Sequence, residues 1–373
     1  MAEPQVIVSR EIHIDLPPEP ELARAVREQG VDVGLDNGRR VRLPADHEKA
    51  LAYAQILATL RRLKQPVYIE IDPDGDTISL VRIPDVGRVH NVRETGDGLE
   101  IEIDTSNIRF ALRKEDPRFE PLSKTLREAA RGRRALILTS DDRHNVLDAR
   151  FFEPGPDDGP LPDIPIPGLR PRWDFFHRWL WWPIWPWTWW YRGCISEWRA
   201  QQLFDAMSSR TCAPLTVPAP CIPFLYPDDG CWARAHEMAR LMIDMGLSPR
   251  KVWIRGSLRT PTRNNPNCAV YWGWHVAPTL CVRRFWWWLW IIPWVSRRMV
   301  IDPSLFTAPV TVAQWKSVQG DPNATLTYTD ASDYRWGETD PTYAKTVDRL
   351  AFYRARLLER AVNVGPPPYA NCP

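Results

Sequence analysis

The segment YPDDGCWARAHEMARLMIDMG, residues 226–246, decides the fold of the second half of the chain. It begins with the turn and capping residues Asp228, Asp229 and Gly230, continues with helix-favouring residues, and ends at a glycine that suits a helix C-cap. The segment therefore predicts a helix with Cys231 in its first turn. Apolar residues four, seven and eleven positions further on place the thiol at the head of the buried stripe.

A thiol at the N-terminal end of a helix lies close to backbone N–H groups that have no partner inside the helix. Their partial positive charge lowers the pKa of the thiol, and the same N–H groups can bind an oxyanion. Cys231 is therefore a candidate nucleophile. The alternative interpretation of this helix alone is a small, unreactive core cysteine, because free cysteines are commonly buried.

Two segments downstream of this helix supply a base and an acid in chain order. AVYWGWHVAPTLCV, residues 269–282, has the aromatic and β-branched composition of a strand and carries His275 in its middle. RRMVIDPSLF, residues 297–306, predicts a second strand that ends at Asp302. A helix-borne cysteine followed by a histidine and an acid on successive strands is the order found in papain-like and transglutaminase-like enzymes.

The strings DGCWARAHEM, WGWHVA and VIDPSLF, continued by FTAPVTVAQW to Trp315, closely resemble the protein-glutaminase family, bacterial enzymes that deamidate glutamine side chains in intact proteins. The resemblance begins near Cys221 and implies a catalytic triad. In that triad Cys231 is the nucleophile, His275 is the base and acid, and Asp302 orients the imidazole. The implied chemistry needs no metal and no organic cofactor.

His236 is the competing histidine, because it follows Cys231 on the same helix. Five residues at about 100° each place it roughly 140° away around the helix axis, so it cannot readily share the face of the thiol. The family resemblance likewise treats His236 as part of the helix and not as the base.

The first half of the chain, residues 1–152, predicts a separate α+β domain. A helical pattern at 46–64 precedes the strand-like segments VYIEI and TISLVRI, and a second one at 122–131 precedes ALILT and NVLDARF. The recurring order predicts two copies of an α-β-β unit. We interpret this domain as binding, inhibitory or scaffolding, because its four histidines stand alone among charged residues, namely His13, His47, His90 and His144.

A linker separates this domain from the catalytic one. Residues 154–171 hold seven prolines and three glycines, a composition that does not support helix or inner strand. We therefore predict a linker at 153–171 and, at 172–373, an α+β papain- or transglutaminase-like domain in which the cysteine helix packs on an antiparallel sheet. In the resemblance, residues 1–152 stand where secreted protein-glutaminases carry a pro-region, which predicts a zymogen-like chain. A domain that only stabilises or recruits is the alternative.

Composition excludes several other classes of protein. The net charge is +2 and the pI is about 8.2, which provides no basic field for nucleic-acid binding. No secretory signal is visible at the N-terminus, so localisation stays open. The apolar stretches are shorter than the roughly 20 residues of a membrane-spanning helix and contain prolines. Seven cysteines without C-x-x-C spacing predict neither a zinc site nor a complete disulfide framework, and leave at least one free thiol.

Tryptophan is concentrated in two segments. Residues 172–194 hold eight, and residues 286–294, in an expected protruding hairpin between the histidine and aspartate strands, hold five. The simpler interpretation is that these segments pack against each other or against the first domain. The alternative is a membrane-surface or substrate-docking patch, which flanking arginine pairs at 283–284 and 297–298 would support.

The sequence as a whole predicts an enzyme, a protein-glutamine glutaminase that hydrolyses glutamine side chains to glutamate through a cysteine thioester and releases ammonia. Its expected partner is a protein or peptide with an exposed glutamine, and the oligomeric state stays open. A transglutaminase or a cysteine peptidase with the same triad is an alternative. A non-enzymatic binding module, which would keep the helix for structure only, is the third.

Overall fold

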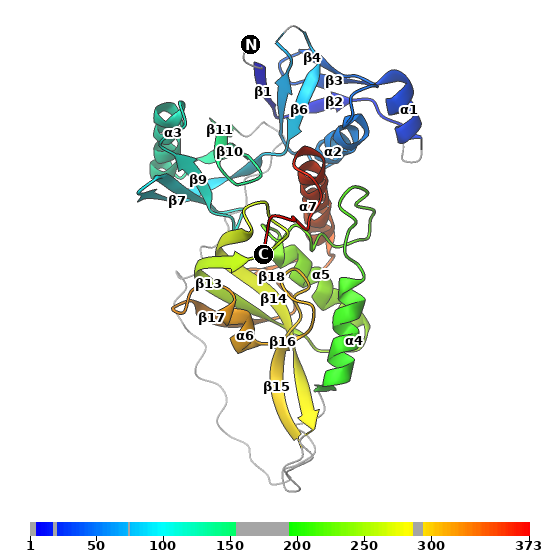
Figure 1. Cartoon of the computed structure of the whole chain (residues 1–373), viewed down its shortest axis with the longest axis vertical. Helices are drawn as coiled ribbons and strands as arrows, with labels where there is room; N and C mark the ends of the chain where they lie inside the picture. The colour runs from blue at the N-terminus through cyan, green and yellow to red at the C-terminus, as the bar shows by residue number, and fades with distance from the viewer. Residues whose placement is uncertain (1–4, 18–20, 74, 154–193, 286–293) are drawn as a thin grey trace.

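The computed structural model describes residues 5–17, 21–73, 75–153, 194–285 and 294–373. In these ranges the first half of the chain forms two lobes, a first lobe (5–83) and a second lobe (85–151), and residues 194–373 form a C-terminal lobe below them (Figure 1). Helices and antiparallel sheets occur in all three lobes. The predicted mixed α+β class is therefore confirmed.

The first lobe contains two small antiparallel sheets. The sheets have the orders β1-β5-β6 and β2-β3-β4. The elements are β1 (Gln5–Ser9), β2 (Ile12–Ile14), α1 (Leu22–Gln29), β3 (Val31–Leu35), β4 (Arg40–Leu43), α2 (Ala50–Arg62), β5 (Val67–Ile71) and β6 (Ile78–Arg82). Apolar residues of α2 face the C-terminal lobe, and α2 packs on its last helix, so one hydrophobic core runs from the first lobe into the C-terminal lobe.

The second lobe is a five-stranded antiparallel sheet with one helix on it. The strand order is β11-β10-β7-β8-β9. The elements are β7 (Asp85–Thr95), β8 (Gly98–Ile103), β9 (Phe110–Arg113), α3 (Phe119–Gly132), β10 (Ala135–Ser140) and β11 (Val146–Phe151). Alternating apolar residues of these strands meet Leu122 and Leu126 of α3 in a separate core. The lobe therefore has a hydrophobic core of its own.

Both predicted α-β-β segments fold as a helix followed by a hairpin. The hairpin after α2 joins a three-stranded sheet, whereas the hairpin after α3 lies at the edge of a five-stranded sheet. Their descent from one repeated unit stays a prediction.

The C-terminal lobe is built on a sheet of order β16-β15-β14-β13-β17, with β12 added parallel to β14. Its strands are β12 (Ile195–Ser196), β13 (Arg250–Pro261), β14 (Ala269–Phe285), β15 (Trp294–Val300), β16 (Val310–Thr311) and β17 (Thr325–Asp330), and a separate pair is β18 (Asp333–Arg335) with β19 (Glu338–Thr339). The long strands β14 and β15 run antiparallel and extend beyond the rest of the sheet (Figure 1). The expected hairpin therefore exists in its described part.

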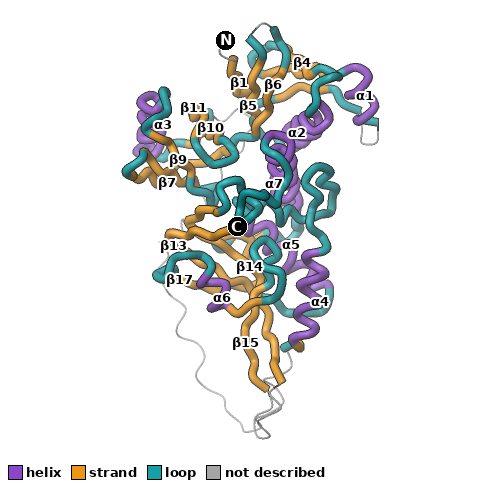
Figure 2. The backbone as a smooth tube through the Cα atoms, in the orientation of Figure 1, coloured by secondary structure: helices purple, strands orange, loops and turns teal. Residues whose placement is uncertain are grey.

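The described residues of this lobe also form four helices, namely α4 (Glu197–Ser208), α5 (Cys231–Asp244), α6 (Val312–Ser317) and α7 (Ala344–Asn363). Helix α5 packs on β14 and on α7, and α7 in turn contacts α2 of the first lobe (Figure 2). Almost every side chain of α5 is buried, from Cys231 to Met242. The predicted helix thus sits between the sheet and α7, where its first turn faces the middle of β14.

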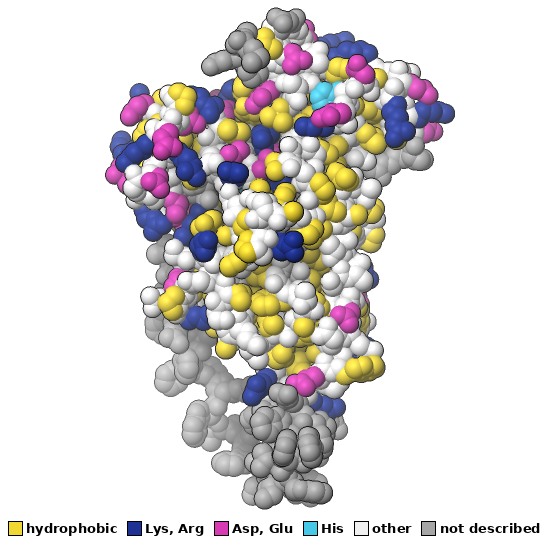
Figure 3. Space-filling view, viewed as in Figure 1, with side chains coloured by type: hydrophobic (Ala, Val, Ile, Leu, Met, Phe, Trp, Pro, Cys, Tyr) yellow, Lys and Arg dark blue, Asp and Glu magenta, His cyan; other side chains and the backbone are white. Residues whose placement is uncertain are grey.

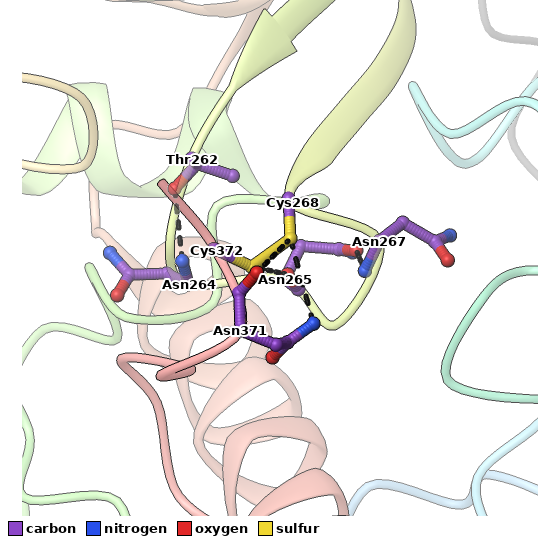
Figure 4. Close-up of a disulfide and its surroundings, with 7 residues drawn as sticks. All are labelled: Thr262, Asn264, Asn265, Asn267, Cys268, Asn371 and Cys372. Carbon is purple, nitrogen blue, oxygen red and sulfur yellow. Dashed lines mark hydrogen bonds between the residues drawn. A yellow bond between two sulfur atoms is a disulfide. The ribbon is translucent and has the colours of Figure 1, made fainter.

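Six of the seven cysteines form disulfides, a pairing that the sequence left open, and the expectation of at least one free thiol is confirmed. The pairs are Cys194–Cys281, Cys212–Cys221 and Cys268–Cys372, and Cys231 is free. Two of the pairs join residues 87 and 104 positions apart, so sequence spacing could not reveal them. Figure 4 shows how the third pair fastens the C-terminal segment to the asparagine-rich loop between β13 and β14.

Residues 172–193 and 286–293, which hold most of the tryptophan-rich sequence, lie outside the described residues. On the face shown in Figure 3, charged side chains gather on the first and second lobes, and the C-terminal lobe presents mainly hydrophobic and uncharged groups. Among the described residues, no helix is both long and apolar enough to cross a membrane.

Candidate active site

A tight turn sets the position of Cys231. Gly230 precedes α5 with φ +76°, and a Cβ added to it would lie 2.2 Å from the ring of Tyr353. Only glycine combines this left-handed conformation with so close an approach. Of the three predicted turn and capping residues, Gly230 is the N-cap, and Asp229 accepts a hydrogen bond from the Gly230 N–H at 2.8 Å.

The thiol of Cys231 lies in the interior. Its residue is 1% exposed, and the backbone N–H of Val276, directly after His275, stabilises the sulfur. Burial raises the pKa of this thiol well above its usual value, and the charge of Arg234 offsets only part of that rise. The expectation of a lowered pKa is wrong for this arrangement, because it did not include the desolvation of the buried thiol.

His275 is held from three sides. It lies in the middle of β14, where its Nε2 is 2.8 Å from Oδ2 of Asp302. The imidazole stacks on Trp272 with ring centroids 4.4 Å apart, and on Trp315 at 5.5 Å. Its other nitrogen, Nδ1, is buried without a hydrogen-bond partner among the described residues. That nitrogen is thus the one left for exchanging a proton with another group.

Asp302 follows β15 by two residues, so the predicted strand ends earlier, at Val300. The chain stays beside β14, because Ile301 donates its N–H to the carbonyl of Pro278 at 3.0 Å. Trp315 Nε1 donates to the same Oδ2 that contacts His275, at 3.0 Å. Burial opposes ionisation, but His275 and Trp315 together lower the pKa of the Asp302 carboxyl below its usual value. The acid is therefore a carboxylate that accepts from the imidazole.

The competing histidine is in a different environment. Nδ1 of His236 is 2.8 Å from Nζ of Lys251, and its ring packs against Tyr334 and Tyr343. Burial, followed by the charge of Lys251, lowers the pKa of His236 to about 4. This placement agrees with the predicted angle of roughly 140° around the helix axis between His236 and Cys231.

The turn before Cys231 is anchored by Asp228, for which sequence reasoning predicted only a capping role. Its carboxylate contacts His144 Nε2 at 2.8 Å and Arg360 Nη1 at 2.6 Å, and also accepts from Asn265 Nδ2. Burial opposes ionisation, but Arg360 and His144 keep the pKa of Asp228 well below its usual value. His144, expected to stand alone, thus links the second lobe to the turn before Cys231.

A short segment of the second lobe, residues 105–109, covers this turn and β14. Ser106 Oγ donates to Asp229 Oδ2 at 2.6 Å, and the Asn107 side-chain amide donates to the carbonyl of Trp274 at 3.1 Å. Ile108 forms an antiparallel bridge with Trp272. The segment therefore lies beside β14 like a short added strand. It contacts Asp229, two residues before Cys231, and Trp274, directly before His275.

Asp229 accepts hydrogen bonds from two residues of this cover, Ser106 and Asn107. Burial and the nearby Asp85 raise the pKa of the Asp229 carboxyl, and Ser106 and Gly230 stabilise its charged form. Sequence reasoning did not find the covering role of residues 105–109, since DTSNIRF carries no motif. Cys231, His275 and Asp302 are each at most 2% exposed, so a protein substrate has no access to them in this arrangement.

Residues 200–319 match a protein-family model described as glutaminase. The match covers the cysteine helix, the histidine strand and the aspartate, and confirms both the resemblance to the glutaminase family and the prediction of an enzyme. No curated protein matches the chain significantly.

The chain is also similar to solved structures. A pro-protein-glutaminase crystal structure is 18% identical, with 77% of this chain and 97% of that chain covered and a TM-score of 0.48. A protein-glutaminase crystal structure is 24% identical, with coverages of 48% and 98% and a TM-score of 0.36. The NMR structure of protein-glutaminase from Chryseobacterium proteolyticum is 24% identical, with coverages of 48% and 97% and a TM-score of 0.36.

Proposed function

We propose that the chain hydrolyses the side-chain amide of protein-bound glutamine to glutamate and ammonia. One observation carries the proposal. Nε2 of His275 contacts the buried carboxylate of Asp302, and Nδ1 has no hydrogen-bond partner among the described residues. The next residue, Val276, provides the backbone N–H that contacts the free thiol. This arrangement falls within the glutaminase match. It supports Cys231 as nucleophile, His275 as base and Asp302 as orienting acid, the three roles that amide hydrolysis through a thioester requires.

The reaction begins with a proton moving from the Cys231 thiol to Nδ1 of His275, while Nε2–H donates to Asp302. The sulfur attacks the amide carbon, and the backbone N–H of Cys231 together with a second donor stabilises the oxyanion. The tetrahedral intermediate collapses as the imidazolium gives its proton to the amide nitrogen, which leaves as ammonia. Water, deprotonated by His275, then attacks the thioester; the carboxylic acid forms and the thiol regains its proton.

The test is to incubate a glutamine-rich protein with the wild-type chain and with Cys231→Ala, and to measure ammonia and the mass of the product. A gain of about one mass unit per glutamine, with loss of ammonia and dependence on Cys231, is expected from the chemistry of amide hydrolysis. Crosslinking to lysine would indicate a transglutaminase, and chain cleavage a peptidase. Activity that survives Cys231→Ala would overturn the proposal.

We further propose that residues 1–152 are an inhibitory region. The contacts of residues 105–109 with Asp229 and β14, together with the burial of Cys231, support this role. While the cover is in place, desolvation keeps the thiol protonated and therefore a poor nucleophile. Removing the cover admits substrate and water at the same time. Because the thiol is then hydrated, its pKa falls.

Cleavage within 154–171 tests this part of the proposal. The rate of ammonia release and the rate of Cys231 alkylation by iodoacetamide are compared for the intact chain, for the cut chain and for residues 172–373. Both rates rise together after cleavage if the cover inhibits by burial. Equal rates in all three forms would show that residues 1–152 only stabilise or recruit.

A further inference from the structure

Two arginines stack against the residue that follows Cys231. The guanidinium carbon of Arg335 lies 4.9 Å from the ring centroid of Trp232, and that of Arg349 lies 5.9 Å from it. Arg335 is 5% exposed and ends β18, and Arg349 lies on α7. Two unrelated elements thus bring positive charge to one aromatic ring beside the nucleophile.

The charge of Arg335 is poorly compensated. Within the described part of the chain, Arg335 has one carboxylate in ion-pair range, Glu338, at 4.0 Å, and that carboxylate also accepts from Lys345. The neighbouring Asp348 is engaged by Arg62 at 3.1 Å. The Nε of Arg335 has no hydrogen-bond partner among the described residues. A buried guanidinium with an unused donor is expensive unless an anion joins it.

Arg335 and Arg349 also face space that an anion can fill. Together with Trp232 they line a pocket of about 430 Å³, and Glu338, Lys345 and Asp348 also line it. Burial, helped by the charge of Arg349, lowers the pKa of Arg335, which agrees with a guanidinium that has too little negative charge beside it. The pocket is large enough for a carboxylate side chain.

The cover shows from which side a substrate chain approaches this pocket. The segment runs antiparallel to β14, and Gly273 donates its N–H to the carbonyl of Asn107 at 3.1 Å. Two residues before Asn107, the carbonyl of Thr105 accepts from Arg335 Nη1 at 3.4 Å. A chain that follows this path therefore passes Arg335 before it reaches the residues flanking His275.

We infer that Arg335 and Arg349 form a subsite for an acidic side chain of the substrate protein, located two or three residues before the target glutamine. The inference rests on the proposed function, and on a substrate that pairs with β14 as residues 105–109 do. A carboxylate there receives charge-assisted hydrogen bonds that its amide analogue receives only weakly. Arg335 and Arg349 are then specificity-determining residues and take no part in the chemistry at Cys231.

The test uses whichever of the intact or linker-cut chain is active, with matched peptides that carry Asp, Asn or Lys three residues before glutamine. A second set carries them two residues before it. We expect kcat/KM to be about tenfold higher for Asp than for Asn in one of the two sets, and the ratio to shrink as ionic strength rises. Arg335→Gln and Arg349→Gln each bring the ratio toward one, and Arg335→Glu favours the Lys peptide.

Arg240→Gln is the matched control. Arg240 lies on the helix that begins at Cys231 but contacts Glu237 and Asp244 at 2.6 and 2.9 Å, so this variant retains the Asp preference. Equal ammonia release from Asp and Asn peptides in both sets by the wild-type enzyme would overturn the subsite alone. No ammonia from any peptide would overturn the proposed function and the subsite with it. The wild-type ratio and its salt dependence decide the question even if a variant fails to fold.

Discussion

The two halves of the candidate site are held in different ways. His275 is fixed by residues of its own lobe, through Asp302 and between the rings of Trp272 and Trp315. Cys231 is surrounded by groups that depend on other lobes, since Ser106 binds Asp229 and His144 binds Asp228 in the turn before it. The imidazole can therefore keep its orientation when the lobes separate, whereas the environment of the thiol must change. Regulation by burial would act on the nucleophile and leave the base prepared.

The first prediction concerns the proton-transfer pair, where the effect is largest. We expect Cys231→Ser and His275→Ala each to lower kcat for ammonia release by about 10⁴-fold, because neither thiolate nor base can be replaced by a neighbouring group. His236→Ala is the matched control, since that imidazole contacts Lys251. Circular dichroism of each variant checks the fold. Loss of activity in His236→Ala but not in His275→Ala would reverse the assignment of the base.

Removing the groups that hold the His275 imidazole is expected to give the next largest loss of activity. Asp302→Ala leaves His275 without an acceptor at Nε2, and we expect kcat to fall by about 10²- to 10³-fold, less than on loss of the nucleophile or the base. Trp315→Phe keeps an aromatic ring but removes the N–H that binds Asp302 at 3.0 Å, with an expected loss of about tenfold. The pH profile of kcat/KM is the measurement. Unchanged profiles in both variants would argue against a role of Asp302 through His275.

Loss of the Ser106 hydroxyl is expected to weaken the binding of the cover, residues 105–109, to the turn before Cys231. Ser106→Ala leaves the buried carboxylate of Asp229 with one hydrogen bond fewer, which weakens the cover by about 1.5 kcal/mol. We expect iodoacetamide to alkylate Cys231 about tenfold faster in the uncut variant than in the uncut wild type. Ser123→Ala is the control, because its hydroxyl donates to Glu120 within α3. Equal alkylation of the Ser106 and Ser123 variants would show that this contact does not hold the cover closed.

Local pattern predicted several elements closely. VYIEI is β5 from Val67 to Ile71, NVLDARF contains β11, and the cysteine helix begins at Cys231 itself. These segments carry period-two or helical patterns that depend on near neighbours in the chain. Helix geometry alone predicted that His236 does not share the face of Cys231. In the structure His236 contacts Lys251.

Features that depend on distant residues could not be predicted in this way. The pairing of Cys268 with Cys372 and the contact of His144 with Asp228 join segments 104 and 84 positions apart. The burial that raises the thiol pKa comes from the assembled lobes, whereas the helix-terminus argument considered α5 alone. The order of residues along the chain predicted Asp302 as the acid. The stacking of Trp315 on His275 could not be predicted, because it depends on the path of the chain after β15.

The smallest expected effect concerns the ion pairs between the lobes. Glu359 of α7 lies 3.7 Å from both Arg82 of the first lobe and Arg356, and Asp142 faces it from the second lobe. Burial raises the pKa of Glu359 from 4.5 to about 7, although both arginines oppose the rise. The folded chain therefore holds this proton more tightly than the unfolded chain. The resulting stability is complete below about pH 4.5 and is lost as the pH rises through about 7.

Glu359→Gln tests this relation, because the amide keeps the shape of the side chain without its titration. The wild type loses about 1–3 kcal/mol from this group between pH 5 and pH 8, and the variant does not. We expect the melting temperature of the wild type to fall by a few degrees more than that of the variant over this interval. All other residues are the same in the two chains, so the difference between the two curves isolates Glu359. Parallel curves would mean that the arginines keep Glu359 ionised throughout, and that the lobes are joined by a full ion pair at neutral pH.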